Sequence, residues 1–370
     1  MFFNFLMSIP TLPSLLALGF LLIPVPFCPG ADYQTIPTPP SEQMAIFKEM
    51  AAKTNFSVYK LDESRNIVFV GFCHGKHGRS AYPDEQQIDK KGQDLPGLTD
   101  ADFAKILHFP QLRAVATQFQ TITDDGYAVL RAFPELEAVN LSNLKTGFKD
   151  EASAGAPPTS AVFRHLEGAR DLRYWNTTHS FGYQKEPAVL QELTGYPDLE
   201  YLNVDVGHAN DFEELFPFIQ KSPKLKFLKL HRTNFREEEV KMILDALPEL
   251  ERLDIKPSGN EPGERWSYQS LALIKNYPNL KSLRLIHGDA LPLPWENGLE
   301  HLVEAENLKY FDFPMEADGK QVSSEALQRL QEARPELIIL PLIEDRQERN
   351  AQRDAMEVDA TEFKMEIGPT

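Results

Sequence analysis

The stretch YPDLEYLNV, residues 196–204, follows a helix-like run, and its pattern returns in SPKLKFLKL at 222–230, LPELERLDI at 247–255 and YPNLKSLRL at 277–285. Written as Leu-x-x-h-x-h, with h an apolar residue, it recurs at intervals of 24 to 36 residues and begins at Leu112, Leu136, Leu172, Leu199, Leu225, Leu250, Leu280, Leu308 and Leu337. Such self-similarity is typical of a solenoid, in which each unit buries its apolar edge only by stacking on its neighbours. The sequence therefore predicts a stack of coils.

Each coil is predicted to contain a helix, a stop and a strand. Apolar residues three and four apart predict helices, for example over 102–109 and 238–247. A proline lies two residues before the leading leucine in most units, at Pro110, Pro134, Pro197, Pro223, Pro248, Pro278 and Pro335. Proline ends a helix and favours extended backbone before it. In the strand that follows, alternation points Leu202 and Val204 into the core and the residues between them outward.

Strands of successive coils are expected to stack in parallel, and the bulkier helices on the other side make such a stack curve. This α/β arrangement, with strands on the concave face and helices on the convex face, resembles the leucine-rich repeat family over residues 99–343. Repeats of that family carry an Asn eight residues after the first Leu, where this chain has Gln120, Leu144, Thr233 or Ser258. The resemblance implies a recognition scaffold, and it names no target.

Charge and composition narrow the choice of partner. The 370 residues are 42% hydrophobic and 25% charged, as in an ordinary folded protein, and the formal net charge is -17. So acidic a chain disfavours binding to a nucleic acid backbone. The expected partner is a protein, no nucleic acid partner is expected, and the oligomeric state stays open.

The first 31 residues carry no charged side chain, and their apolar run from Ser14 to Ile23 is too short to span a bilayer. The run and the small residues 28–31 after it predict an export signal over 1–31, so the protein is expected to be secreted or located in the periplasm or cell envelope. An uncleaved or lipidated anchor remains open, and the membrane would then be contacted only through this segment. A structural role in the envelope is a further alternative.

The ends of the stack are predicted to differ from its repeats. Residues 32–65 form a linker and an N-terminal cap, with a short helix over 41–54, and residues 66–98 form the first strand, at 66–72, and a long loop. Residues 344–370 form an acidic tail with few apolar anchors, for which disorder is expected.

One segment, 72–79, has the residue types of a chemical site. Cys73, His74 and His77 are candidate ligands for a metal ion, although no second cluster at metal spacing supplies a fourth ligand. A metal-dependent enzyme or hydrolase built on this loop is therefore the alternative function. The competing interpretation is a glycine-punctuated loop, and no catalytic motif accompanies it. The chain is predicted not to be an enzyme and to need no cofactor.

The outward positions of the strands provide the candidate binding face. The position two after each leading leucine holds Ala114, Ala138, Tyr174, Tyr201, Phe227, Arg252, Ser282, Tyr310 and Ile339. Beside the three neighbouring aromatics, the candidate face includes Asn176, Asn203, Asp205, Lys229, His231 and Arg252. Flat apolar area edged by hydrogen-bonding groups recurs in recognition surfaces. Strand propensity alone also places aromatics in such lanes, so a purely structural role is the alternative.

Overall fold

The computed structural model describes most of the repeat region and parts of both ends. The described residues are 33–74, 86–89, 95–142, 158–177, 195–205, 212–231, 235–255, 267–286, 295–313, 316–317, 320–321, 324–343, 345, 347–349 and 351–352. The predicted export segment, His77 and most of the predicted tail lie outside them. Within the described residues, no helix is long and apolar enough to cross a membrane.

One long curved sheet organises the chain, and its strands follow in the order β14-β11-β10-β9-β8-β7-β6-β5-β4-β2-β1-β3. The strands are β1 (Phe56–Leu61), β2 (Ile67–Cys73), β3 (Gln86–Asp89), β4 (Ala114–Gln118), β5 (Ala138–Ser142), β6 (Tyr174–Asn176), β7 (Tyr201–Asp205), β8 (Phe227–His231), β9 (Arg252–Ile255), β10 (Ser282–Leu285), β11 (Tyr310–Asp312) and β14 (Ile338–Ile339). Pairing is parallel from β2 through β4 to β14. A separate hairpin pairs β12 (Glu316–Ala317) with β13 (Lys320–Gln321).

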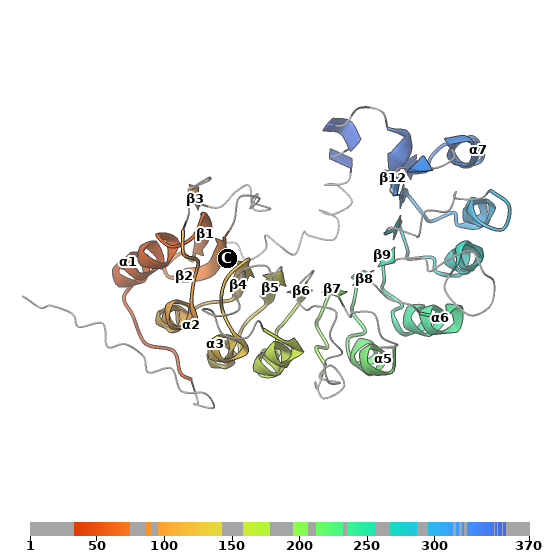
Figure 1. Cartoon of the computed structure of the whole chain (residues 1–370). Coiled ribbons are helices and arrows are strands. Elements are labelled where there is room, and N and C mark those ends of the chain that lie inside the picture. The colour runs from red at the N-terminus through yellow and green to blue at the C-terminus, as the bar shows by residue number, and fades with distance from the viewer. Residues whose placement is uncertain are drawn as a thin grey trace, which may run out of the picture.

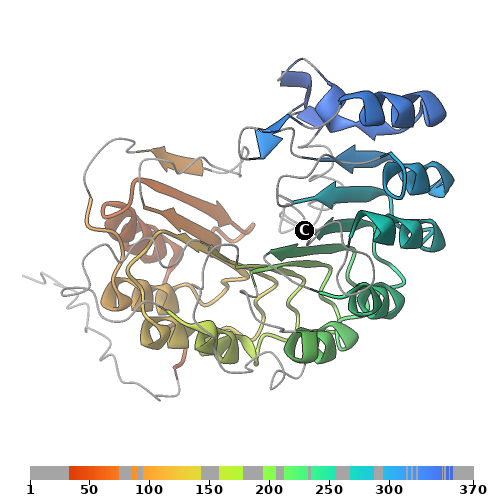
Figure 2. The same ribbon diagram turned by 45° about the vertical axis from the view of Figure 1, so that its right-hand side comes forward.

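Short helices line the outer side of this sheet, and the strands line the inner side (Figures 1 and 2). The α-helices are α1 (Pro40–Ala51), α2 (Asp100–Phe103), α3 (Asp124–Tyr127), α5 (Phe212–Gln220), α6 (Glu237–Ala246) and α7 (Ser324–Ala333). The 3-10 helices are η1 (Ala104–His108), η2 (Ala128–Ala132), η4 (Ser160–Leu166), η5 (Tyr268–Asn276), η6 (Leu299–Glu304) and η7 (Leu340–Leu342). The predicted leucine-rich repeat solenoid is confirmed, with strands on the concave face and helices on the convex face.

A β-turn joins helix to strand in each coil. The amide of the leading leucine donates to the carbonyl three residues earlier, as from Leu112 to Phe109 at 3.0 Å and from Leu250 to Leu247 at 3.1 Å. Proline thus occupies the second position of the turn, where its fixed φ fits. Two coils lack the proline, yet Leu172 and Leu308 make the same bond, at 3.3 and 2.9 Å. Proline therefore favours this turn, but the turn does not require it.

The strand register follows the predicted alternation through all but the last coil. Leu202, Leu228, Leu253 and Leu283 align across β7 to β10 and are buried, and Tyr174, Tyr201, Phe227 and Arg252 align on the opposite face. The prediction was wrong at Ile339, because Tyr310 pairs with Ile338 and Ile339 points into the core. The last coil is one residue shorter between its turn and its strand.

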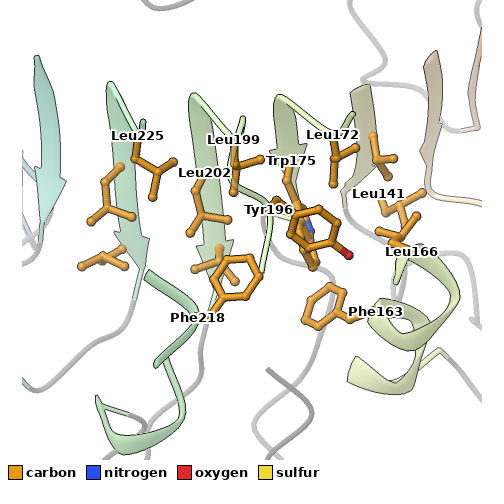
Figure 3. Packing of buried hydrophobic residues seen from close by; sticks show 14 of the residues in the cluster. Leu141, Phe163, Leu166, Leu172, Trp175, Tyr196, Leu199, Leu202, Phe218 and Leu225 are labelled. Carbon is orange, nitrogen blue, oxygen red and sulfur yellow. The ribbon is translucent and has the colours of Figure 1, made fainter. Parts of the chain in front are cut away.

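The core is a continuous layer between sheet and helices, and the leading leucines form a row along it (Figure 3). Its largest fully buried side chain is that of Trp175. Trp175 makes edge-to-face contacts with Phe163, Tyr196 and Phe218, at centroid distances of 4.7, 5.4 and 5.4 Å. Edge-to-face pairs add to the stabilisation that burial provides. These aromatics come from neighbouring coils, so they tie the coils together.

The N-terminal end is more elaborate than a single strand. The predicted cap helix is present as α1, and the predicted first strand is present as β2. Strand β1 pairs antiparallel with β2 and with β3, so a hairpin and a third strand extend the sheet beyond the repeats. An antiparallel cap of this kind covers the apolar edge of the first coil, which has a neighbour on one side only.

Polar side chains link successive coils where helices begin. The Asp100 carboxylate accepts bonds from the amide and hydroxyl of Thr123, both at 2.7 Å, and Asp124 does the same for Thr159 at 2.8 and 2.6 Å. Gln120 stands at the position of the family's Asn, and its side chain accepts from the Leu98 amide and donates to a nearby carbonyl. The Gln120 amide therefore links Leu98 to the end of β4.

Charges alternate in sign along the residues that follow the first seven leading leucines, and Lys309, next to Lys281, ends the alternation. The lane contains Arg113, Glu137, Arg173, Glu200, Lys226, Glu251 and Lys281. Ion pairs join Arg113 to Glu137 at 2.5 Å, Glu200 to Arg173 and Lys226 at 2.5 and 3.0 Å, and Lys281 to Glu251 at 2.9 Å. Exposed pairs of this kind add little stability, but like charges on adjacent strands would be unfavourable. The alternation favours the observed order of coils.

His165 in η4 makes the solenoid sensitive to acid. Its Nε2 lies 3.0 Å from the Asp124 carbonyl, so the neutral ring donates there. Burial, helped by the nearby Arg131, lowers the pKa of His165 from 6.5 to about 4. The unfolded chain therefore takes up this proton first as the pH falls. We expect the free energy of unfolding to decrease by about 1–2 kcal/mol between pH 6.5 and 4 through this group, after allowing for solvent screening.

Urea unfolding of the wild type and of His165→Gln at several pH values measures this contribution. The difference between the two proteins should change across that window and stay constant above pH 7. A constant difference from pH 7 to 4 would show that His165 does not hold its proton more weakly in the folded state.

Candidate binding face

Three aromatic rings stack on the concave face where the sequence predicts them. Register pairs Tyr174 with Tyr201 and Tyr201 with Phe227 across β6, β7 and β8. The ring centroids are 4.1 Å apart in both pairs, with interplanar angles of 18° and 0°. These three residues, here called the ring stack, form an apolar cluster separate from the main core. Parallel strands in strict register hold the rings face to face.

A cation closes one end of the ring stack. The Arg252 guanidinium carbon lies 4.8 Å from the centroid of the Phe227 ring, within the range of a cation–π contact. Its Nε and Nη2 donate to the Asp254 carboxylate at 2.8 and 3.1 Å. Arg252 and Asp254 stand two apart on one strand, so they share a face. On the concave face, the row of aromatic side chains is therefore followed by charged side chains.

Four residues of β9, β10 and β11 form a charge network, composed of Arg252, Asp254, Arg284 and Asp312. Arg284 lies 3.9 Å from the Asp254 carboxylate and 3.2 Å from that of Asp312. Burial alone would raise the pKa of Asp254, but Arg252 and Arg284 hold it below its usual range. Asp254 therefore stays ionised, and its fully buried charge is compensated by two guanidinium groups.

Asparagines run beside the ring stack. Asn140, Asn176 and Asn203 are aligned across β5, β6 and β7. The Asn203 side chain is buried, and within the described residues its Oδ1 has no hydrogen-bond partner. Ser282 in β10 is paired with Arg252 of β9, and its hydroxyl is also buried without a hydrogen-bond partner among the described residues. An unmade hydrogen bond at a buried polar group is costly, so a donor supplied by another molecule would be favoured at these atoms.

The ring stack differs from the prediction in its exposure. Tyr174, Tyr201 and Phe227 expose 4%, 8% and 2% of their surface, and Arg252 is equally buried. The expected open aromatic surface is therefore wrong, although the rings point to the predicted side of the sheet. Arg252 is likewise covered rather than solvated, because its side chain contacts Phe227 and Asp254.

The remaining candidates occupy the same strands. Asn176 and Lys229 are half-buried on the concave side. Asp205 and His231 are paired in register at the ends of β7 and β8, and their side chains lie outside the described part. The strands thus bring the candidate positions onto one surface spanning β6 to β9. Sequence reasoning missed the charge network, whose signal is an Arg-x-Asp pattern in β9 beside Arg284 and Asp312.

The loop at 72–79, predicted as a candidate metal site, is described only as far as His74. Cys73 is a buried free cysteine among Phe56, Val58 and Phe69, and burial raises the pKa of its thiol to about 11. A thiol with so high a pKa is a poor nucleophile near neutral pH. His74 donates its backbone amide to Gln118 at 3.0 Å. Among the described residues, no three His, Cys, Asp or Glu side chains gather as metal ligands.

Comparison with known proteins finds similar chains among solved structures. No protein-family model and no curated protein matches the sequence. Among solved structures, the chain matches an internalin from Listeria monocytogenes str. 4b F2365, over 76% of this chain and 99% of that chain, with 12% sequence identity and a TM-score of 0.29. The fold assignment rests on the parallel sheet and its helices rather than on this match.

Proposed function

We propose that the chain is a non-enzymatic recognition scaffold that binds a protein on the concave surface of β6 to β9. The observation that carries the proposal is the pair of buried polar atoms, Asn203 Oδ1 and Ser282 Oγ, beside the ring stack and the charge network. Within the described residues both lack a partner, and a bound backbone or side chain would satisfy them. Stacked aromatics and arginines are also the residues that dominate protein interfaces energetically.

The partner is proposed to be a protein rather than a nucleic acid because the chain is strongly acidic, with a net charge of -17. Location in the secreted or envelope fraction rests on the uncharged segment 1–31 alone. Asn176 and Lys229 are the positions that a partner would reach first, since they are half-buried while the rings are covered.

A pull-down from the native extracellular or envelope fraction tests the proposal. The bait is the wild type beside a Tyr174→Ala, Tyr201→Ala, Phe227→Ala variant. We expect one protein retained by the wild type and reduced at least tenfold by the variant. The three substitutions remove the aromatic area of the proposed binding surface and the ring over which the Arg252 guanidinium lies, so the surface offered to the partner is lost.

The matched control is Tyr277→Ala, because the Tyr277 hydroxyl donates to Asp245 at 2.9 Å on the helical side. It should retain the partner as the wild type does, and circular dichroism should show every bait folded. Equal recovery by wild type and triple variant would refute binding at the ring stack and revive the metal-dependent enzyme or envelope alternatives.

A further inference from the structure

The sequence contains three acceptor tripeptides for N-linked oligosaccharides, of the form Asn-x-Ser/Thr, at Asn55, Asn140 and Asn176. An attached oligosaccharide is bulky and hydrophilic, so in exported proteins such tripeptides are expected in surface loops. Asn55 and Asn140 expose only 4% and 7% of their surface, and Asn176 is half-buried. Two of the acceptors therefore lie inside the packed part of the structure.

Asn55 lies in the N-terminal cap, directly before β1. Its tripeptide continues with Phe56 and Ser57, which are 8% and 0% exposed, and the Ser57 hydroxyl lies 2.5 Å from that of Thr54. Strand β1 is paired on both sides, with β2 and with β3. A sugar ring on the Asn55 amide would have to displace packed groups of the cap, and overpacking of this kind is destabilising.

Asn140 lies within the parallel sheet, in β5. Its register partners are Ala116 in β4 and Asn176 in β6, on strands about 4.8 Å away. The Ser142 hydroxyl of the same tripeptide donates to Asn140 Oδ1 at 2.9 Å, and both side chains are buried. Since Asn140 is covered as well as flanked, a sugar ring on its amide would also displace packed groups.

Buried asparagines can react with the glycosylating enzyme only before the chain folds. In that reaction the amide nitrogen attacks the anomeric carbon of a lipid-pyrophosphate oligosaccharide, the bond from that carbon to the pyrophosphate breaks, and the amide loses a proton. A chain modified at Asn55 or Asn140 could then no longer reach the structure described here. We propose that the protein folds only where this transfer does not occur, so that the export proposed above follows a route without N-glycosylation.

Asn176 supports the same conclusion by a separate argument. It is paired in register with Asn140 and Asn203, on the concave side of the sheet. An oligosaccharide on Asn176 would cover the surface that is proposed to bind the partner. This argument rests on the proposed function, whereas the burial of Asn55 and Asn140 does not.

Targeting the full chain to the secretory pathway of a eukaryotic cell tests the inference. The natural sequence is compared with a Ser57→Ala, Ser142→Ala, Thr178→Ala variant, which keeps the asparagines but removes all three acceptor signals. Mass spectrometry locates the oligosaccharides, and the secreted yield reports folding. We expect oligosaccharides at Asn55 or Asn140 of retained natural chain, and about fivefold or more of the variant in the medium, because cells retain and degrade chains that cannot fold.

Two controls separate glycosylation from other effects of the substitutions. Produced in a host without N-glycosylation, both proteins should be recovered folded in similar yield. Adding Lys309→Thr to the variant completes an acceptor tripeptide at Asn307, which is exposed in a turn, and this chain should be glycosylated there and still secreted. Equal secretion of the natural chain and the variant, or a secreted natural chain that melts cooperatively with an oligosaccharide on Asn55 or Asn140, would overturn the inference, whatever the outcome of the pull-down.

Discussion

Leu228→Asp should unfold the middle of the solenoid. Leu228 is fully buried between Leu202 and Leu253, which align with it on the neighbouring strands. The substitution removes an apolar side chain and places a carboxyl group in the core without a partner. Together these effects should cost about 5 kcal/mol or more, a large part of the stability of an ordinary domain. Thermal melting followed by circular dichroism measures the loss.

The matched control is Met242→Asp in α6. Met242 is 45% exposed, so the same carboxyl group enters water there, and the melting temperature should change by only a few degrees. If Leu228→Asp melted like the wild type, Leu228 and the leucines aligned with it would not point into the core. The register of the strands on the concave face would then be wrong.

Arg334→Met should detach the C-terminal coil. The guanidinium of this buried arginine donates to the carbonyls of Leu302 and Ala305 at 3.1 and 2.8 Å, and to those of Glu306 and Leu308 at 3.2 and 3.1 Å. It therefore joins the end of α7 to the preceding coil. Methionine preserves the length of the side chain but makes none of these bonds, so we expect a loss of about 3–5 kcal/mol.

Hydrogen exchange locates that loss. A terminal coil has one neighbour only, so residues 324–343 should lose protection while 235–255 keep theirs. Arg329→Met is the control on the same helix, because Arg329 is exposed and lies 4.4 Å from the Trp295 ring centroid, a contact worth at most about 1 kcal/mol. Unchanged protection of 324–343 in Arg334→Met would show that the four bonds do not hold this coil.

The repeat units were predictable because one chemical rule governs each position. A leading leucine, a proline two residues earlier and alternating apolar residues specify turn, strand and inward face. The rule fails at the last coil, where Leu337-Ile-Ile-Leu340 is apolar at every position. With no alternation to read, only backbone pairing reveals that Ile338 rather than Ile339 lies opposite Tyr310.

The sequence contains a pattern that predicts the N-terminal hairpin. In β1, Phe56 and Val58 alternate with Ser57, and the turn residues 62–66 separate this run from β2. Alternation followed by turn residues is the usual pattern of a hairpin. Assigning residues 32–65 to a linker and a cap helix missed the strand, because a run this short gives little periodicity to detect.

The candidate face was predictable in its position but not in its environment. Strand register alone fixes that Tyr174, Tyr201 and Phe227 stack, and that Arg252 comes next. Burial depends on what lies above the sheet, which no local pattern encodes. The network of Arg252 with Asp254 likewise needs the spacing of neighbouring strands, because Arg284 and Asp312 are far away in sequence.

Site-specific photo-crosslinking tests binding on the concave face most directly. A benzophenone amino acid placed at Asn176, half-buried in β6, is compared with the same group at the exposed Met242 of α6, in the native extracellular or envelope fraction. Light should join the concave position to one partner protein in an intermolecular adduct, and that adduct should be at least tenfold weaker from Met242. Equal adducts from both positions, or a partner captured from Met242 alone, would contradict a concave binding face.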